Sequence, residues 1–171
     1  MSQANNNPVQ AQSPQYERFE DEETGQQAVD RLLEQSGREL RIFDPDLSGL
    51  RLNMPDRIAR LQRFLLGSRI RRIYIAIHDT AYVSKYCPRV RDLLARYAHA
   101  IQIQQTDEEI RELQDAFLVL DANHYVRRPA ARYWRGAIGI GDESEALAMR
   151  ARFLEIWAAS YPALSPTTLG L

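Results

Sequence analysis

The sequence predicts an α/β domain built of layers. Two observations support this fold class: apolar residues recur at helical spacing in several segments, and short runs rich in Ile, Val, Leu and Tyr lie between those segments. Strands that alternate with helices are typical of a sheet whose strands are joined by crossover connections. The 171 residues are enough for one domain with a substantial core, and 44% hydrophobic and 26% charged residues are ordinary values for a globular protein.

Helix starts are indicated by capping patterns and by prolines. Thr24 and Gln27 form a capping-box pattern, and Pro55 stands in a first turn, where its missing N–H costs nothing. The expected helices begin at Thr24, Pro55, Pro88 and Asp142. Strands are expected at 39–43, 70–77, 100–104, 116–120, 125–126 and 134–140.

The composition of the two ends differs from that of the middle. Residues 1–23 are rich in Gln, Asn, Ser and Pro and then become acidic, a composition that cannot bury enough apolar surface to order itself. We therefore expect a disordered tail at 1–23, a folded domain at 24–162 and a short C-terminal tail at 163–171.

Charge and cysteine content exclude several classes of protein. The net charge of −1 gives no general attraction to nucleic acid or membranes, and the single Cys87 excludes an intrachain disulfide framework and a multi-cysteine zinc site. No secretory signal and no apolar run of membrane-spanning length is present. We expect a soluble cytoplasmic protein with no cofactor, no bound metal and no membrane association.

The most informative segment is Gln114 to Asp121, which contains the apolar strand expected at 116–120. It reads Gln114-x-Ala116-x4-Asp121, and this is the spacing of the motif His-x-Lys-x4-Asp. That motif marks the phospholipase D superfamily. The order of elements between Glu39 and Ser160 and the closing helix with Phe153-x3-Trp157 also resemble one half of such a protein. The nearest resemblance is to uncharacterised bacterial phospholipase-D-like domains, some of which are attached to an acetyltransferase domain.

The resemblance implies a mixed sheet flanked by helices and a particular chemistry. In active members two motifs meet, one His attacks phosphorus, the other protonates the leaving oxygen, and the lysines bind phosphate oxygens. Gln114 cannot act as nucleophile or acid, and Ala116 carries no charge. The Gly-Ser-x-Asn segment of such enzymes has no match at 127–131, and no His-x-Lys occurs anywhere in the chain.

The first functional hypothesis is therefore a non-catalytic phospholipase-D-like module that serves in binding, regulation or assembly. The resemblance implies a homodimer, because members with a single motif pair two halves, and it suggests an acetyltransferase as a protein partner. Soluble homo-oligomers also most often use two-fold symmetry.

Two clusters of arginine suggest a second hypothesis, the binding of nucleic acid or of a phosphate ligand. Seven arginines lie between 51 and 72, and Arg57, Arg60 and Arg63 are expected on the polar side of the second helix. They could also dock the acidic segment 17–23, or lie on a solvated helix face. The second cluster mixes arginine with aromatic residues, and its candidate binding residues are Arg127, Arg128 and Trp134. The alternative is an ordinary amphipathic strand whose arginine side chains point into solvent.

A third hypothesis is an enzyme that uses polar groups at the ends of strands. The candidates are Asp44, His78, Asp79 and Asp107. Ligands of open α/β sheets bind beyond the carboxyl ends of the strands, so these groups could converge on a small molecule or, with weaker support from the pattern, a metal. The alternative is that they form turns and helix caps, as Asp commonly does.

Overall fold

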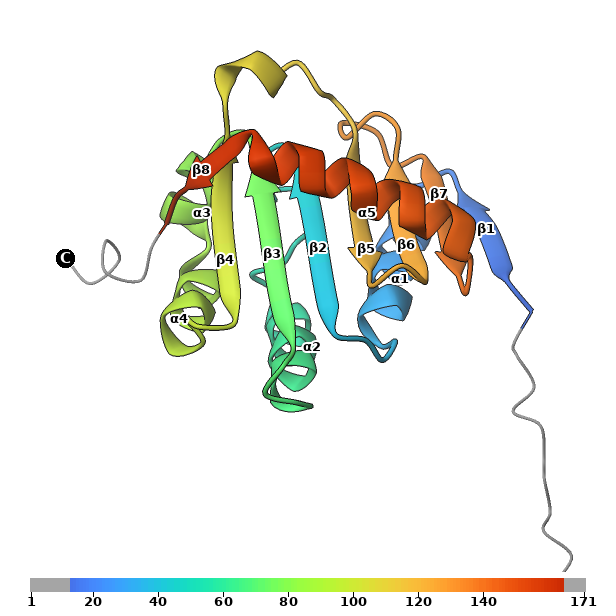
Figure 1. The fold of residues 1–171 in the computed structure, drawn as a ribbon, viewed down its shortest axis with the longest axis horizontal. Helices are drawn as coiled ribbons and strands as arrows, with labels where there is room; N and C mark the ends of the chain where they lie inside the picture. Colours follow the sequence, from blue (N-terminus) through green and yellow to red (C-terminus); the bar gives the residue numbers. More distant parts are fainter. Residues whose placement is uncertain (1–12, 165–171) are drawn as a thin grey trace, which may run out of the picture.

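The computed structural model describes residues 13–164 and contains one mixed sheet of eight strands (Figure 1). The strand order is β1-β7-β6-β5-β2-β3-β4-β8. The strands β2, β3 and β4 run parallel to one another, and every other neighbouring pair is antiparallel. Their bounds are β1 Gln15–Phe19, β2 Glu39–Asp44, β3 Arg72–Ile77, β4 Ile101–Thr106, β5 Ala116–Leu120, β6 His124–Arg128, β7 Gly136–Ile140 and β8 Ser160–Pro162. The prediction of a mixed sheet flanked by helices is confirmed.

Helices cover both faces of the sheet. The helices α1 to α4 pack on one face, and the single long helix α5 crosses the other face diagonally (Figure 1). Their bounds are α1 Glu22–Leu33, α2 Pro55–Leu66, α3 Ala81–Tyr86, α4 Pro88–Arg96 and α5 Glu143–Ala158, with a 3₁₀ turn η1 at Glu108–Ile110. Each strand of the sheet's centre is therefore buried on both sides, which explains why β5 is apolar throughout.

The side chains of β2 divide between two cores. Leu40 and Ile42 pack with the four-helix layer, while Phe43 packs under α5 with Phe117 and Phe153. This alternation is what a strand imposes, because successive side chains point to opposite faces. It also fixes which face of the sheet each side chain of β2 can reach.

The first helix begins earlier in the structure than the sequence predicted. Asp21, and not Thr24, occupies the N-cap position, and its carboxylate accepts a hydrogen bond from the Thr24 N–H at 2.8 Å. Sequence reasoning also missed α3, whose six residues are too short to show a helical period.

The predicted disordered tail at 1–23 is wrong for its last part, while residues 1–12 lie outside the described residues. Gln15–Phe19 forms β1, which pairs antiparallel with β7. Phe19 is buried and its ring lies 6.4 Å from that of Trp134, and Glu17 forms an ion pair with Arg31 at 2.6 Å. The average composition of the tail hid this short alternating segment, because β1 is held by its partner strand and by one anchoring aromatic residue.

The predicted C-terminal tail at 163–171 is wrong for its first two residues. β8 pairs with β4, the Ala163 N–H donates to the Ile103 carbonyl at 3.0 Å, and Leu164 packs against the core. Residues 165–171 lie outside the described part of the chain. Within residues 13–164, no helix combines the length and the apolar character that crossing a bilayer requires.

Candidate functional site

The two degenerate motif positions lie at the beginning of β5. Gln114 is exposed just before the strand, and its amide reaches the carbonyl oxygens of Glu112 at 3.3 Å and of Arg111 at 3.5 Å. Ala116 is the first residue of β5 and is buried. The site thus presents an amide and a methyl group, which supply neither a nucleophile nor a fixed cation.

The third motif position, Asp121, joins two strands. Its backbone has a positive φ of 53°, and its carboxylate accepts hydrogen bonds from the N–H groups of Arg38 at 3.0 Å and Glu39 at 2.9 Å. Its own N–H donates to the Glu39 carbonyl at 3.0 Å. Asp121 therefore fastens the end of β5 to the beginning of β2, which is a structural role.

Arg128 and Asp44 form an internal ion pair. Arg128 Nη2 donates to Asp44 Oδ1 at 2.9 Å, and the two residues are 3% and 2% exposed. Burial raises the pKa of Asp44 against the pull of Arg128 and two backbone N–H groups, and it lowers the pKa of Arg128. The expectation that these two residues lie on a binding surface is wrong, because packing encloses both.

Trp134, another candidate binding residue, belongs to the same internal arrangement. The Arg128 guanidinium carbon lies 4.1 Å from the centre of its ring. A Cβ atom added at Gly25 would come within 2.4 Å of the ring, so α1 approaches the indole closely. Trp134 thus links β1, α1 and the ion pair, and its ring is mainly a packing surface.

His78 is held between two partners. Its Nε2 lies 2.7 Å from the Leu113 carbonyl oxygen, so this nitrogen must donate, and Nδ1 then accepts from the Thr106 hydroxyl at 2.5 Å. Both ring nitrogens are therefore occupied. This explains how His78 fixes the segment between η1 and β5 and why it offers no free base.

The other two strand-end candidates, Asp79 and Asp107, each form a different hydrogen bond within the fold. Asp79 accepts from the Ala81 N–H at 2.8 Å and so helps to begin α3, while Asp107 is exposed and donates its N–H to the Ala159 carbonyl at 2.9 Å. Asp44 is enclosed with Arg128, and each of the other three residues makes a contact of its own. Among residues 13–164, no group of three or more His, Cys, Asp or Glu side chains could hold a metal ion.

The arginines of α2 are largely neutralised by α1. Arg57 is only 6% exposed, and it donates to Asp30 at 2.8 Å and to the carbonyls of Leu50 and Gln26. Arg60 pairs with Asp30 and Glu34. The expectation that Arg57 lies on the outer side of α2 is wrong, since α1 packs beside it.

Arg63 is exposed on α2, as expected for its polar side. Asp30 on α1 and its C-cap residue Glu34 are four residues apart, and this spacing was the signal in the sequence that the two acidic partners of Arg57 and Arg60 share one side of the helix. The acidic segment 17–23 also docks within the same chain, as one alternative proposed, because Glu22 pairs with Arg51 at 2.6 Å.

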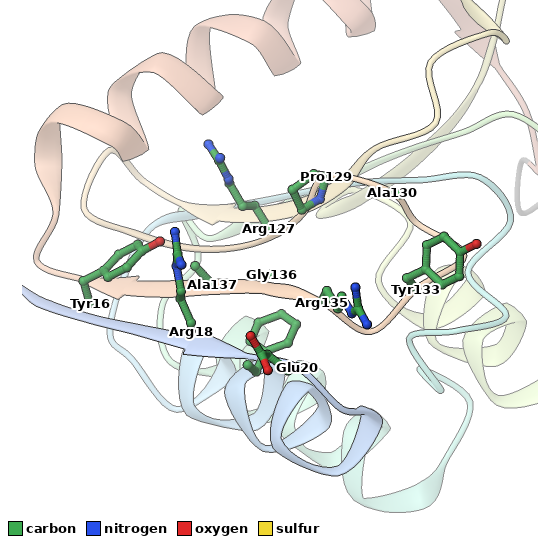
Figure 2. Close-up of a pocket in the computed structure, with 11 residues that line it drawn as sticks. Tyr16, Arg18, Glu20, Arg127, Pro129, Ala130, Tyr133, Arg135, Gly136 and Ala137 are labelled. Atoms are coloured by element: carbon green, nitrogen blue, oxygen red, sulfur yellow. The ribbon is translucent and has the colours of Figure 1, made fainter.

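A pocket of about 370 Å³ lies on the α5 side of β6, β7 and β1. Arg127 on β6 and Arg18 on β1 both stand opposite Ala137 of β7, so the two guanidinium groups flank a single methyl group. Figure 2 shows both side chains rising from the sheet on the same side. Arg135, just before β7, adds a third cation to the lining, and we call this site the arginine pocket.

Two exposed tyrosines and one carboxylate complete the arginine pocket. Tyr16 is 57% and Tyr133 is 54% exposed, and Glu20 follows β1 (Figure 2). Sequence reasoning named Arg127 as a binding candidate but missed Arg18, because β1 had been assigned to the tail. The signal was the alternation of Tyr16 and Arg18 with Glu17 and the buried Phe19.

The helix α5 begins on the β6 side of the sheet and runs toward β8, so it leads away from β1 and the pocket (Figure 1). The Tyr125 hydroxyl donates to Asp142 Oδ2 at 2.7 Å, and Asp142 is the N-cap residue of α5. Tyr125 leans over Gly139 so closely that a Cβ atom there would meet its ring at 2.4 Å. Burial raises the pKa of Tyr125 above its ordinary value, and the phenol therefore remains protonated and able to donate.

Comparison with known families decides the classification of this domain. Residues 21–166 match the family described as Domain of unknown function (DUF7931). The chain belongs to this family. No curated protein matches the sequence of this DUF7931 domain.

Solved structures show the fold of the DUF7931 domain. TrmBL2, an archaeal chromatin protein described with a novel mode of DNA binding, is similar with a TM-score of 0.62 at 14% identity over 86% of this chain and 54% of its own. The phospholipase D family member Nuc from Salmonella typhimurium has a TM-score of 0.58 at 11% identity, covering 88% of this chain and 99% of its own. Phosphatidylserine synthase from Haemophilus influenzae Rd KW20 has a TM-score of 0.57 at 13% identity, and the match covers 91% of this chain and 41% of the synthase.

These similarities confirm the predicted phospholipase-D-like fold. The DUF7931 chain spans about half the length of TrmBL2 and almost all of Nuc. At identities of 11–14% the likeness concerns the fold, and the site has to be judged from its own residues.

Proposed function

We propose that this DUF7931 protein is a non-catalytic phospholipase-D-like module that acts by binding, in regulation or assembly. One observation carries the proposal: Gln114 and Ala116 occupy the positions at which the resemblance calls for His and Lys. An amide and a methyl group cannot attack phosphorus or protonate a leaving group, and neither supplies the fixed positive charge of a lysine.

The roles of the remaining polar groups support the proposal. Asp121 holds two strands together, Asp44 and Arg128 satisfy each other inside the domain, and His78 has both ring nitrogens engaged. A general base must be able to reach the proton it removes. These groups are committed to the fold, and the exposed cations of the arginine pocket are better suited to binding.

The test is turnover of phosphodiesters by the purified chain. We expect bis(p-nitrophenyl) phosphate, single-stranded DNA and phosphatidylcholine vesicles to be hydrolysed no faster than in buffer. The matched variant is Gln114→Ala, which alters the motif position at an exposed site. Hydrolysis by the wild-type chain that disappears in Gln114→Ala would contradict the proposal, because it would assign chemistry to this strand.

We also propose a homodimer and an acetyltransferase as partner, on the basis of the resemblance to single-motif members and to domains linked to acetyltransferases. Light scattering across micromolar concentrations should give twice the mass of the 171-residue chain. A monomer mass throughout would overturn the dimer. Affinity purification from the source cells followed by mass spectrometry should recover an acetyltransferase, and its consistent absence would argue against that partner.

Binding of nucleic acid is the second candidate function. The exposed Arg63 and the arginine pocket favour it, whereas Arg57 and Arg60 are neutralised by α1. Contacts to phosphates would make the binding steeply dependent on salt. Charge reversal of Arg63 should then weaken DNA or RNA binding, and binding that is absent or insensitive to salt would exclude this candidate.

A further inference from the structure

We infer that the arginine pocket binds a small organic dianion, specifically a phosphomonoester attached to a flat ring. This inference deepens the proposed function, since it rests on the module acting by binding, and it names the class of ligand. The site is separate from the degenerate motif, because neither Gln114 nor Ala116 lines the pocket.

The register of three strands places two guanidinium groups for one anion. Arg18 and Arg127 both stand opposite Ala137, one on each side of β7. Neighbouring strands are about 4.8 Å apart, so the two Cα atoms are roughly 10 Å apart, and long side chains can converge on an oxyanion above the alanine. The planar fork of a guanidinium matches phosphate oxygens with two parallel hydrogen bonds.

The charge of the pocket is unbalanced in favour of a dianion. Its lining has three arginines, Arg18, Arg127 and Arg135, and one carboxylate, Glu20, so three positive charges and one negative charge leave a net +2. Other arginines of this domain are neutralised by partners, as Arg57, Arg60 and Arg128 are. Such an excess of cations on one surface attracts an anion of complementary charge.

The arginines of the pocket are available to a ligand. Within residues 13–164, neither Arg18 nor Arg135 forms an ion pair, and Arg127 only approaches Glu145 at 3.7 Å, where both side chains are about half exposed. That distance is longer than a good hydrogen bond, so a phosphate can replace the carboxylate with little loss.

The apolar and aromatic lining of the pocket suits a flat organic body. Its lining also contains Phe19, Pro129, Ala130 and Ala137, and the lining residues Tyr16 and Tyr133 are exposed. A volume of about 370 Å³ is near the small end of ligand pockets, which suits one small molecule. Tyrosine faces stack well on flat rings, and a nucleoside monophosphate combines such a ring with a dianionic phosphate.

The experiment is calorimetric titration of the full chain with AMP, adenosine and two otherwise identical short DNA strands, one of which carries a 5′-phosphate. AMP should bind at least about tenfold more tightly than adenosine, because charge-assisted hydrogen bonds are lost without the phosphate. Arg18→Ala and Arg127→Ala should each weaken AMP binding by about tenfold. Arg96→Ala is the control, since Arg96 is exposed on α4 outside the pocket, and it should leave AMP binding unchanged.

Several results would overturn the inference: no binding of AMP, equal binding of adenosine, or an equal loss in the Arg96→Ala control. The DNA strands distinguish the source of the phosphate. Binding of only the 5′-phosphorylated strand supports the pocket as a site for a terminal phosphate, whereas equal binding of both strands identifies a backbone contact and rejects it. If AMP does not bind, the proposed non-catalytic module is unaffected, because only the class of ligand is rejected. Conversion of bound AMP to adenosine would support the pocket and overturn the non-catalytic proposal.

Discussion

Arg128 on β6 and Asp44 at the end of β2 are 84 residues apart in the chain, and they meet at 2.9 Å inside the domain. The pair connects the antiparallel part of the sheet to its parallel part. Asp44 also accepts from the N–H of Leu47 at 2.7 Å, so it orders the loop after β2 as well. The loop and the pair are thus one structural unit, whose loss should be costly.

Replacing Arg128 should test that unit. Arg128→Ala leaves the carboxylate of Asp44 buried without its cation, and we expect the free energy of unfolding to fall by about 3–5 kcal/mol. Urea unfolding followed by circular dichroism measures this change. The control is Arg127→Ala, one residue away and 51% exposed, which should change stability by less than about 0.5 kcal/mol. Equal effects of the two substitutions would contradict the structural role of the pair.

Asp121 should be needed for stability. Asp121→Ala removes the acceptor for the Arg38 and Glu39 N–H groups. It also leaves alanine at a φ of 53°, where no side-chain hydrogen bond compensates for the unfavourable backbone conformation. We expect a loss of about 1–3 kcal/mol in urea unfolding. Asp121→Asn keeps one acceptor oxygen and tolerates this backbone region better, so its loss should be smaller. An unchanged stability of Asp121→Ala would mean that the carboxylate does not fasten β5 to β2.

His124 should make stability depend on pH. Its Nδ1 accepts from the Gly141 N–H at 2.9 Å, and burial lowers its pKa, although Asp121 pulls the other way. A lowered pKa means that the unfolded chain binds the proton more readily. The stabilisation by the neutral ring is therefore complete above the unfolded pKa of about 6.5 and is lost as the pH falls toward the folded pKa.

His124→Asn keeps an acceptor near the position of Nδ1 and does not titrate, so its unfolding midpoint should depend less on pH between about 6.5 and 5. His99→Asn, at an exposed position, is the control and should keep the pH dependence of the wild type. Urea unfolding at several pH values checks both variants. A wild-type stability that rises as the pH falls through this range would contradict the assignment to His124.

Phe19 should anchor β1 to the domain. Its ring is buried against Trp134, and Phe19→Ala should cost about 3 kcal/mol or more through lost contacts and a cavity. Tyr16→Ala, on the exposed face of the same strand, should cost less than about 0.5 kcal/mol. Hydrogen exchange should show faster exchange of the β1 amide groups in Phe19→Ala alone. If both variants behave alike, β1 is not held by its aromatic anchor.

Local patterns were sufficient for most of the elements. The helical spacing of Leu61, Phe64 and Leu65 and the apolar run 116–120 predicted α2 and β5, because periodicity reflects which faces are buried. The strand β1 was missed because its order comes from pairing with β7, more than a hundred residues away in the chain. Composition averaged over a whole tail cannot show such a partner.

The candidate site was less accessible to sequence reasoning. The pattern on α2 correctly placed Arg63 outside but could not reveal that Asp30 and Gln26 surround Arg57. Likewise, nothing local distinguishes Arg127 from Arg128, although alternation in a strand sends one to solvent and the other into the ion pair.

The sequence by itself determined the layered α/β class, the order of most elements, and the absence of His and Lys from the motif positions Gln114 and Ala116. These features depend on local spacing and on residue chemistry, which one chain displays directly. Only the tertiary structure decided which charged groups are paired within the domain and which remain exposed for a ligand. Burial and pairing of a charge depend on residues distant in sequence, and for this reason Arg18 and Arg127 became neighbours across β7 while Arg128 was enclosed with Asp44.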